Sequence, residues 1–292
     1  MDPSYPLLAA MAMSLALLQI NQRLASPVIA IVNRWMRWFI FAFGTAYIID
    51  AFGLIDRPYW ALAAICFLLW FLLETLYNWV AISALSHSPL PLFPRYLPNP
   101  GGDEWPMQAR LLKARDWMRA HGYRHLQALR AEVGGGIHLR VSVYENEKDK
   151  VRAQLMFMPE SNGAVSLACV LTSIVQNGGR VVTDNLHIPF GGFYPERWSV
   201  ERMPWCRSLP KLVERHMNRL ARIETPIKAN LIDPLSDIST AQNELDRLNT
   251  DLGFLFPHGD REEHGKITHE GRYRVWKEIW MLDYLGRSAR YL

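Results

Sequence analysis

The sequence predicts a membrane all-α region with three transmembrane helices, followed by a cytoplasmic α+β domain built on an antiparallel sheet of about four or five strands. The first observation is a division of composition: residues 1–86 are dominated by apolar side chains, whereas nearly all the charged residues lie beyond Pro89. The second is a change of period after residue 107, where apolar and polar residues alternate as in half-buried strands. The third is a proline-rich segment, residues 87–106, between the two parts.

Length, charge and cysteine content restrict the kinds of protein to which this chain can belong. A chain of 292 residues is long enough for about two domains. The net charge of +4 and the isoelectric point near 9.0 are too mild to indicate a nucleic-acid-binding protein. The three cysteines, Cys66, Cys169 and Cys206, form no CxxC pair, which suits a reducing compartment without a disulfide framework.

Three apolar stretches account for the predicted membrane region, residues 1–86. They cover residues 5–20, 38–55 and 59–85, and a spanning helix needs about 20 predominantly apolar residues. The first stretch is the shortest, so it either spans the bilayer or lies in the interface. Because it follows Asp2 rather than a basic segment and has no convincing cleavage site, we interpret it as a retained helix and not as a signal peptide.

Basic residues predict the orientation of these helices, since Lys and Arg next to spanning helices stay on the cytoplasmic side. The turn at 56–58 has only Arg57, whereas the other two helix ends are flanked by Arg23, Arg34, Arg37, Arg95, Arg110 and Lys113. The sequence therefore predicts a multi-pass protein of the plasma (inner) membrane, with its N-terminus outside and its C-terminal domain in the cytoplasm.

Four polar residues are the intramembrane candidates for function: Glu74, Arg37, Asp50 and Asn78. If the second and third helices form a hairpin, Arg37 lies within about one helical turn of Glu74 in depth, and the two can pair. We favour an ion pair between helices or a contact with a partner subunit. The alternative is a proton or ion relay through Glu74, Asn78 and Asp50.

The linker, residues 87–106, contains six prolines and two glycines, so no helix crosses it. It either acts as a semi-rigid spacer or lies along the lipid headgroups. The domain at 107–292 begins with an amphipathic helix over 107–118. Residues 137–143 and 151–157 alternate strictly, 165–175 is apolar on both faces, and the NGG turn at 177–179 leads to a strand at 180–184. The glycines at 134–136 predict a turn.

The stretch 185–207 is rich in Gly, Pro and aromatic residues and has no period, so it predicts a long loop. We expect it to bind a partner through Phe193, Tyr194 and Trp198, although it could simply cover the sheet edge. Helices over 209–223 and 239–256 follow, and then a small hairpin over 266–275 that runs into residues 276–285.

Motifs for catalysis are absent: the sequence has no nucleotide-binding, metalloprotease, hydrolase or kinase signature. Cys206 and His216 lie about 15 Å apart along a helix start, so they do not form a nucleophile and base. We interpret His216 as a core histidine, and the potential metal ligands at 258–269 as a solvated surface. No catalytic residue, metal, cofactor or nucleic-acid partner is predicted.

These observations together predict an integral membrane protein of unassigned biochemical activity. We expect an accessory or scaffolding subunit whose cytoplasmic domain binds a partner, with membrane lipid and either another protein or further copies of the chain as its contacts. One alternative is a proton- or ion-coupled transport subunit that uses Glu74. Another is a membrane-anchored cytoplasmic enzyme built around the 185–216 region with Asp184 and His187.

Overall fold

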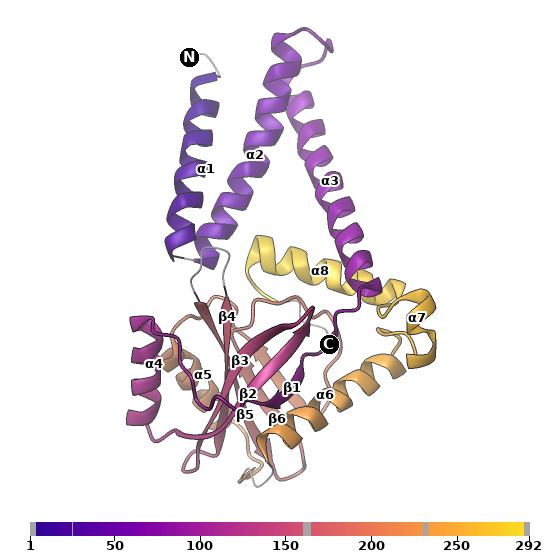
Figure 1. Cartoon of the computed structure of the whole chain (residues 1–292). Coiled ribbons are helices and arrows are strands. Elements are labelled where there is room, and N and C mark those ends of the chain that lie inside the picture. Colours follow the sequence, from indigo (N-terminus) through magenta and orange to yellow (C-terminus); the bar gives the residue numbers. More distant parts are fainter. Residues whose placement is uncertain (1–3, 25, 160–164, 230–232, 289–292) are drawn as a thin grey trace.

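Three long helices project from one end of a sheet-based domain (Figure 1). The computed structural model describes all residues except 1–3, 25, 160–164, 230–232 and 289–292. Helix α1 covers Ser4–Leu24, α2 covers Pro27–Ala51 and α3 covers Tyr59–His87. The three predicted apolar stretches are therefore helical, and α2 packs against α3 through a small buried cluster of Ala46, Leu62 and Ala63.

Helix α3 differs from α1 and α2 in its capacity to cross a membrane. Among the described helices, α3 alone is both long and apolar enough to do so, and only 17% of its apolar window is buried. The apolar sequence of α2 is interrupted by the charged residues Arg34, Arg37 and Asp50. The sequence of α1 becomes polar at Gln19 and Asn21. The prediction of a three-span membrane region is therefore wrong, and multi-pass insertion is not supported.

The sheet is mixed and larger than the predicted antiparallel sheet of four or five strands. Seven strands lie in the order β1-β2-β3-β4-β5-β6-β7, and β8 pairs with β5. All pairs are antiparallel except β6 with β7. The strands are β1 Arg95–Pro98, β2 Arg124–Gly134, β3 Ile137–Asn146, β4 Val151–Pro159, β5 Val165–Val175, β6 Arg180–Asp184, β7 Trp198–Arg202 and β8 Ile227–Lys228.

Strands β3, β4, β5 and β6 match the predicted ones, whereas β1, β2, β7 and β8 were not predicted. The glycine turn between β2 and β3 is confirmed, because Gly134, Gly135 and Gly136 all have positive φ, the region that favours glycine. Strand β2 was missed because its sequence, RHLQALRAEVG, is rich in good helix formers. Strand β7 lies within the predicted loop and depends on its parallel pairing with β6.

Helices cover both faces of the sheet. Helices α4 (Ala109–Ala120) and α5 (Leu209–Leu220) pack on the face formed by alternate residues of β4, namely Val151, Ala153, Leu155 and Phe157. Helix α6 (Pro234–Asp251) packs on the other face through Leu235 and Ile238 against Val141, Val143 and Met156. This arrangement follows from the alternation of strand side chains between the two faces.

The proline-rich linker is fixed to the sheet. Strand β1 adds to the sheet edge by pairing with β2. The Asp103 carboxylate accepts hydrogen bonds from Ser142 Oγ and Tyr144 Oη, both at 2.6 Å. Trp105 is buried in the core on the α4 side of the sheet. Residues 95–105 are therefore ordered against the domain.

The C-terminal helix α8 (His269–Leu285) lies between the sheet and the long helices (Figure 1). It follows a short 3-10 helix, η1 (His258–Asp260), and α7 (Arg261–His264). The hairpin predicted at 266–275 is wrong, because the Thr268 side chain accepts a hydrogen bond from the Gly271 N–H and so starts a helix. Val275 of α8 packs with Ile82 of α3 in a shared apolar cluster.

Candidate functional site

Glu74 lies at a junction between the long helices and α8. Its carboxylate accepts hydrogen bonds from Trp70 Nε1, at 2.9 Å, and from the hydroxyl of Tyr284 on α8. Arg34 of α2 lies 3.7 Å from the other carboxylate oxygen, and it also pairs with Asp283 of α8. Glu74 therefore joins three helices through charged and neutral donors.

Aromatic rings surround this junction. Burial and the neighbouring Glu74 carboxylate raise the pKa of the Tyr284 phenol, so the hydroxyl keeps its proton and remains a donor. The Tyr284 ring stacks on Trp280 with centroids 4.4 Å apart and meets Trp38 edge-on at 5.3 Å. Trp35 Nε1 also donates to the Tyr284 carbonyl at 3.0 Å. The end of α8 is thereby held against α2 and α3.

The other three polar candidates of this region are Arg37, Asp50 and Asn78. The predicted pairing of Glu74 with Arg37 is wrong: Arg37 is exposed, and Arg34, one turn earlier on α2, makes the pair. Asp50 is exposed near the far end of α2. Asn78 is 9% exposed and lies one turn beyond Glu74 on α3.

The loop candidates Phe193, Tyr194 and Trp198 are half-buried and pack inward. The guanidinium of Arg274 lies 3.8 Å from the centre of the Phe193 ring, and that of Arg180 lies 5.3 Å from the Trp198 ring. The rings of Tyr194 and Trp198 stack with centroids 6.5 Å apart. Their contacts join the loop to α8 and the sheet, and a role in partner binding stays a prediction.

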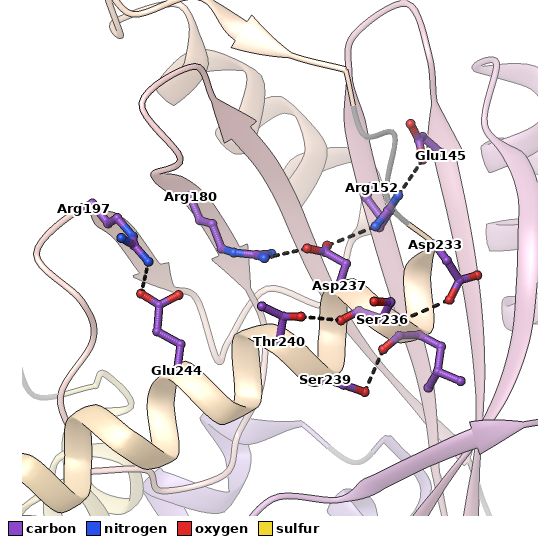
Figure 2. Close-up of polar contacts among 11 residues, drawn as sticks. Glu145, Arg152, Arg180, Arg197, Asp233, Ser236, Asp237, Ser239, Thr240 and Glu244 are labelled. Atoms are coloured by element: carbon purple, nitrogen blue, oxygen red, sulfur yellow. Dashed lines mark hydrogen bonds and ion pairs between the residues drawn. The ribbon is translucent and has the colours of Figure 1, made fainter.

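A chain of buried charges ties α6 to the sheet (Figure 2). Arg152 of β4 donates to Asp237 of α6 at 3.0 Å and to Glu145 of β3 at 3.3 Å. Arg180 of β6 reaches the other oxygen of Asp237 at 2.5 Å. These four side chains are at most 12% exposed. Each charge faces an opposite one at the interface between sheet and helix, so the chain of charges is structural.

A second buried ionic group fixes α8 to the edge of the sheet. Arg202 of β7 lies 3.5 Å from Asp184 and 3.2 Å from Glu278 of α8. It also donates to the carbonyls of Leu186 and Ile188, at 3.1 Å and 2.7 Å. Burial raises the pKa of Asp184, and the Arg202 charge opposes that shift. Arg202 thus links β6, the following loop and α8.

His216 of α5 is fully buried, as the sequence predicted for a core histidine. Its ring nitrogens lie 2.9 Å from Thr183 Oγ1 and 3.2 Å from Ser173 Oγ. Burial and, to a smaller extent, the nearby Arg219 charge together lower the pKa of His216 to about 4. The imidazole is therefore neutral at pH 7, with both nitrogens in contact with hydroxyl groups.

A cavity of about 710 Å³ lies where α1 and α2 meet the sheet domain. This volume falls within the range of roughly 300–1,000 Å³ that is typical of small-molecule sites. Its walls come from the junction of α1 and α2, from α4, from the ends of β4 and β5, and from the segment between β6 and α5. They include Asn21, Ser26, Arg110, Lys113, Trp117, Met158, Ala168, His187, Cys206 and Arg207.

The cavity contains only some of the residues around which the sequence predicted a possible active site, namely the 185–216 region with Asp184 and His187. His187 and Cys206 line it. The Asp184 carboxylate is instead occupied by Arg202, and His216 is enclosed in the core. Among the described residues, no group of three or more His, Cys, Asp or Glu side chains is placed to hold a metal ion.

The basic lining residues of α4 were missed by sequence reasoning. Arg110, Lys113 and Trp117 follow a spacing of three and then four residues, which places them on one face of a helix. That face was recognisable, but nothing in the sequence placed it beside the start of α2.

Comparisons with known proteins return no relationship. No family model, no curated protein and no solved structure matches this chain. Function therefore has to be argued from the geometry alone.

Proposed function

We propose that this protein is a binding or scaffolding protein that is attached to a membrane through helix α3, with its sheet domain presented at the bilayer surface. The observation that supports the proposal is the exposed apolar surface of α3. Large side chains along α3, among them Ile65, Leu68, Leu72, Leu76 and Val80, are about 60% exposed. Side chains of this kind are seldom gathered in so large an exposed patch unless another apolar surface covers them.

The length of this surface favours lipid as its occupant. From Trp60 to Val80 the exposed apolar surface extends over 20 residues, or about 30 Å at 1.5 Å per residue. The hydrocarbon core of a bilayer is also about 30 Å thick. Trp60 is exposed at one end of the surface and Tyr77 near the other, and such amphipathic rings favour the membrane interface.

Charge favours one orientation. Arg95, Arg110 and Lys113 follow α3 in the sheet domain, which carries most of the basic residues, whereas the turn before α3 has only Arg57. Basic residues next to a membrane helix stay on the cytoplasmic side. The sheet domain is therefore proposed to face the cytoplasm, where it would serve as an accessory or scaffolding unit for another protein or for further copies of the chain.

Flotation with liposomes that contain no other protein tests attachment through α3. The purified full-length chain is mixed with vesicles, the detergent is removed, and a density gradient separates bound from free protein. The change is the double substitution Leu68→Arg and Leu72→Arg. A charge at the centre of a membrane helix costs about 2.5–3.5 kcal/mol, so the bound-to-free ratio is expected to fall at least about 50-fold.

The matched control is Ile137→Arg with Leu252→Arg, since these side chains are 58% and 52% exposed but belong to the sheet domain. This control is expected to float like the unaltered chain. Circular dichroism of both variants establishes that each retains its helices and sheet. The proposal fails if the unaltered chain does not float, or if the α3 variant floats as well as the control.

A proton relay through Glu74 stays a prediction. Glu74 is already engaged by Trp70, Tyr284 and Arg34, and these contacts give it a structural role at the junction with α8.

A further inference from the structure

We infer that the cavity between α4, α5 and the start of α2 binds the anionic headgroup of a phospholipid, with the phosphate held by Lys113 and Arg110, while Arg207, which donates to the Leu24 carbonyl, adds positive charge to the wall. The inference rests on the proposed attachment of α3 to a membrane and deepens it by naming a ligand class. Three features of the cavity carry it: its charge, its apolar wall and its place in the fold.

The charge of the cavity selects an anion. Among the described lining residues there are two arginines, one lysine and one histidine, and no Asp or Glu. Arg110 and Lys113 are three residues apart on α4, so their side chains leave the same face of that helix. Several basic side chains in one concave site concentrate positive potential and raise the local concentration of anions.

The start of helix α5 adds to this potential. Ser208, Leu209 and Pro210 line the cavity, and they form the N-cap and first turn of a helix of 12 residues. The Ser208 side chain makes no capping hydrogen bond. A helix N-terminus carries partial positive charge and N–H groups that can donate to an oxyanion. The helix end and the basic side chains therefore act on the same space.

Much of the remaining wall is apolar, although Asn21, Ser26, Ser166 and Asn185 also line it, and this apolar part favours an amphipathic ligand over a free ion. Leu111, Ala114 and Trp117 contribute from α4, Met158 and Leu167 from the ends of β4 and β5, and Ile188 from the segment after β6. A hydrated inorganic phosphate gains nothing from this surface. A headgroup with its glycerol and the first carbons of its acyl chains can bury apolar area there.

The place of the cavity identifies the bilayer as the source of the ligand. Asn21, Ser26, Pro27 and Ala30 lie at the junction of α1 and α2, at the end of the long helices nearest the sheet domain (Figure 1). If α3 is embedded in lipid, this junction lies at the level of the headgroups. An anionic lipid could then enter the cavity from the side, without leaving the membrane.

Native mass spectrometry of the full-length chain in detergent tests the inference. The probe is dihexanoyl phosphatidylglycerol, a short-chain anionic lipid that dissolves as a monomer. Dihexanoyl phosphatidylcholine tests the need for net negative charge, and inorganic phosphate tests the need for the apolar part. The expected order of affinity is phosphatidylglycerol first, with the other two at least about tenfold weaker, because each lacks one of the two complementary surfaces.

Lys113→Gln is the principal variant. It is expected to weaken phosphatidylglycerol binding by about tenfold, as the loss of one charge-assisted hydrogen bond predicts. The matched control is Arg247→Gln, which removes a basic side chain from the exposed surface of α6 and leaves the cavity unaltered. The control is expected to bind phosphatidylglycerol like the unaltered chain, and thermal unfolding shows whether each variant is folded.

Each other outcome overturns the inference. Equal binding of phosphatidylcholine removes the selectivity for an anion, and equal binding of inorganic phosphate points to a soluble phosphate compound instead of lipid. Absence of binding, or equal affinity of Lys113→Gln and Arg247→Gln, removes the site. Because this assay uses monomeric lipid in detergent, its failure leaves the flotation result standing, and failure of flotation alone contradicts the attachment through α3.

Discussion

Apolar side chains are buried in the sheet domain but exposed along the long helix α3. In the sheet domain, Leu155 and Leu171 are fully buried, and Arg152 and Asp237 are buried as an ion pair. Along α3, by contrast, leucines such as Leu72 are exposed. The sheet domain is therefore stabilised by its own core, whereas the exposed face of α3 depends on what surrounds it.

The largest effect that would sharpen this comparison is expected from Asp237→Ala. The substitution leaves Arg152 and Arg180 buried without the carboxylate that joins them (Figure 2). Breaking a buried pair in this way lowers the free energy of unfolding by about 3–5 kcal/mol. Guanidinium unfolding in one fixed detergent, followed by circular dichroism, measures the loss.

The control for this prediction is Asp251→Ala on the same helix. Asp251 is 66% exposed and lies 3.7 Å from Arg247. An exposed pair contributes little, so the free energy of unfolding should stay within about 0.5 kcal/mol of the original. Similar losses for both variants would show that the charges under α6 are no more important than those on its surface.

A smaller effect is expected from matched leucine substitutions in the two regions. Leu155→Ala leaves a cavity in the core of the sheet domain, and the free energy of unfolding should fall by about 2–5 kcal/mol. Leu72→Ala shortens a side chain of a residue that is 61% exposed, so the expected change is below about 0.5 kcal/mol. Equal losses in the same unfolding assay would mean that α3 is packed as a core helix.

The smallest effect is expected at the junction of the two regions. Glu74→Gln keeps the shape of the side chain but removes its charge, so the pair with Arg34 is lost and the bond from Tyr284 weakens. Local opening of α8 should become easier by about 1–2 kcal/mol, which is a rise of roughly 5- to 30-fold in amide hydrogen exchange near residues 280–285.

Glu263→Gln is the control for exchange, because that side chain is 82% exposed on α7. It should leave exchange in α8 unaltered. If exchange in α8 is also unaltered in Glu74→Gln while a proton-dependent activity is lost, Glu74 acts as a relay and not as a structural link.

Local pattern was sufficient to predict the central strands. Strict alternation identified β3 and β4, and the NGG turn identified the hairpin between β5 and β6. Strands β2 and β7 were missed because long-range pairing overrides their local preferences. The three apolar helices were found, but apolar composition overstated the ability of α1 and α2 to cross a membrane.

The candidate sites were predictable only in part. The sequence indicated that Glu74 needs a cationic partner, yet depth alone could not decide between Arg34 and Arg37, which differ in rotation around the axis of α2. Tyr284 lies 210 residues from its partner Glu74 in the chain, and Asp283 lies 249 residues from its partner Arg34. No local pattern relates residues so far apart. The cavity was missed for the same reason, since four separate segments form it.

Helix α8 has a consequence for how the sheet domain would meet other molecules. One part of α8 is bonded to α3 through Tyr284, and another to the sheet through Glu278. A domain on a flexible tether tumbles and samples many orientations, and each partner must then restrict that freedom on binding. Here the restriction is already present in the folded chain. If α3 is held in a bilayer, another molecule bound to that bilayer would meet the sheet domain at a fixed distance from the lipid and in a fixed orientation.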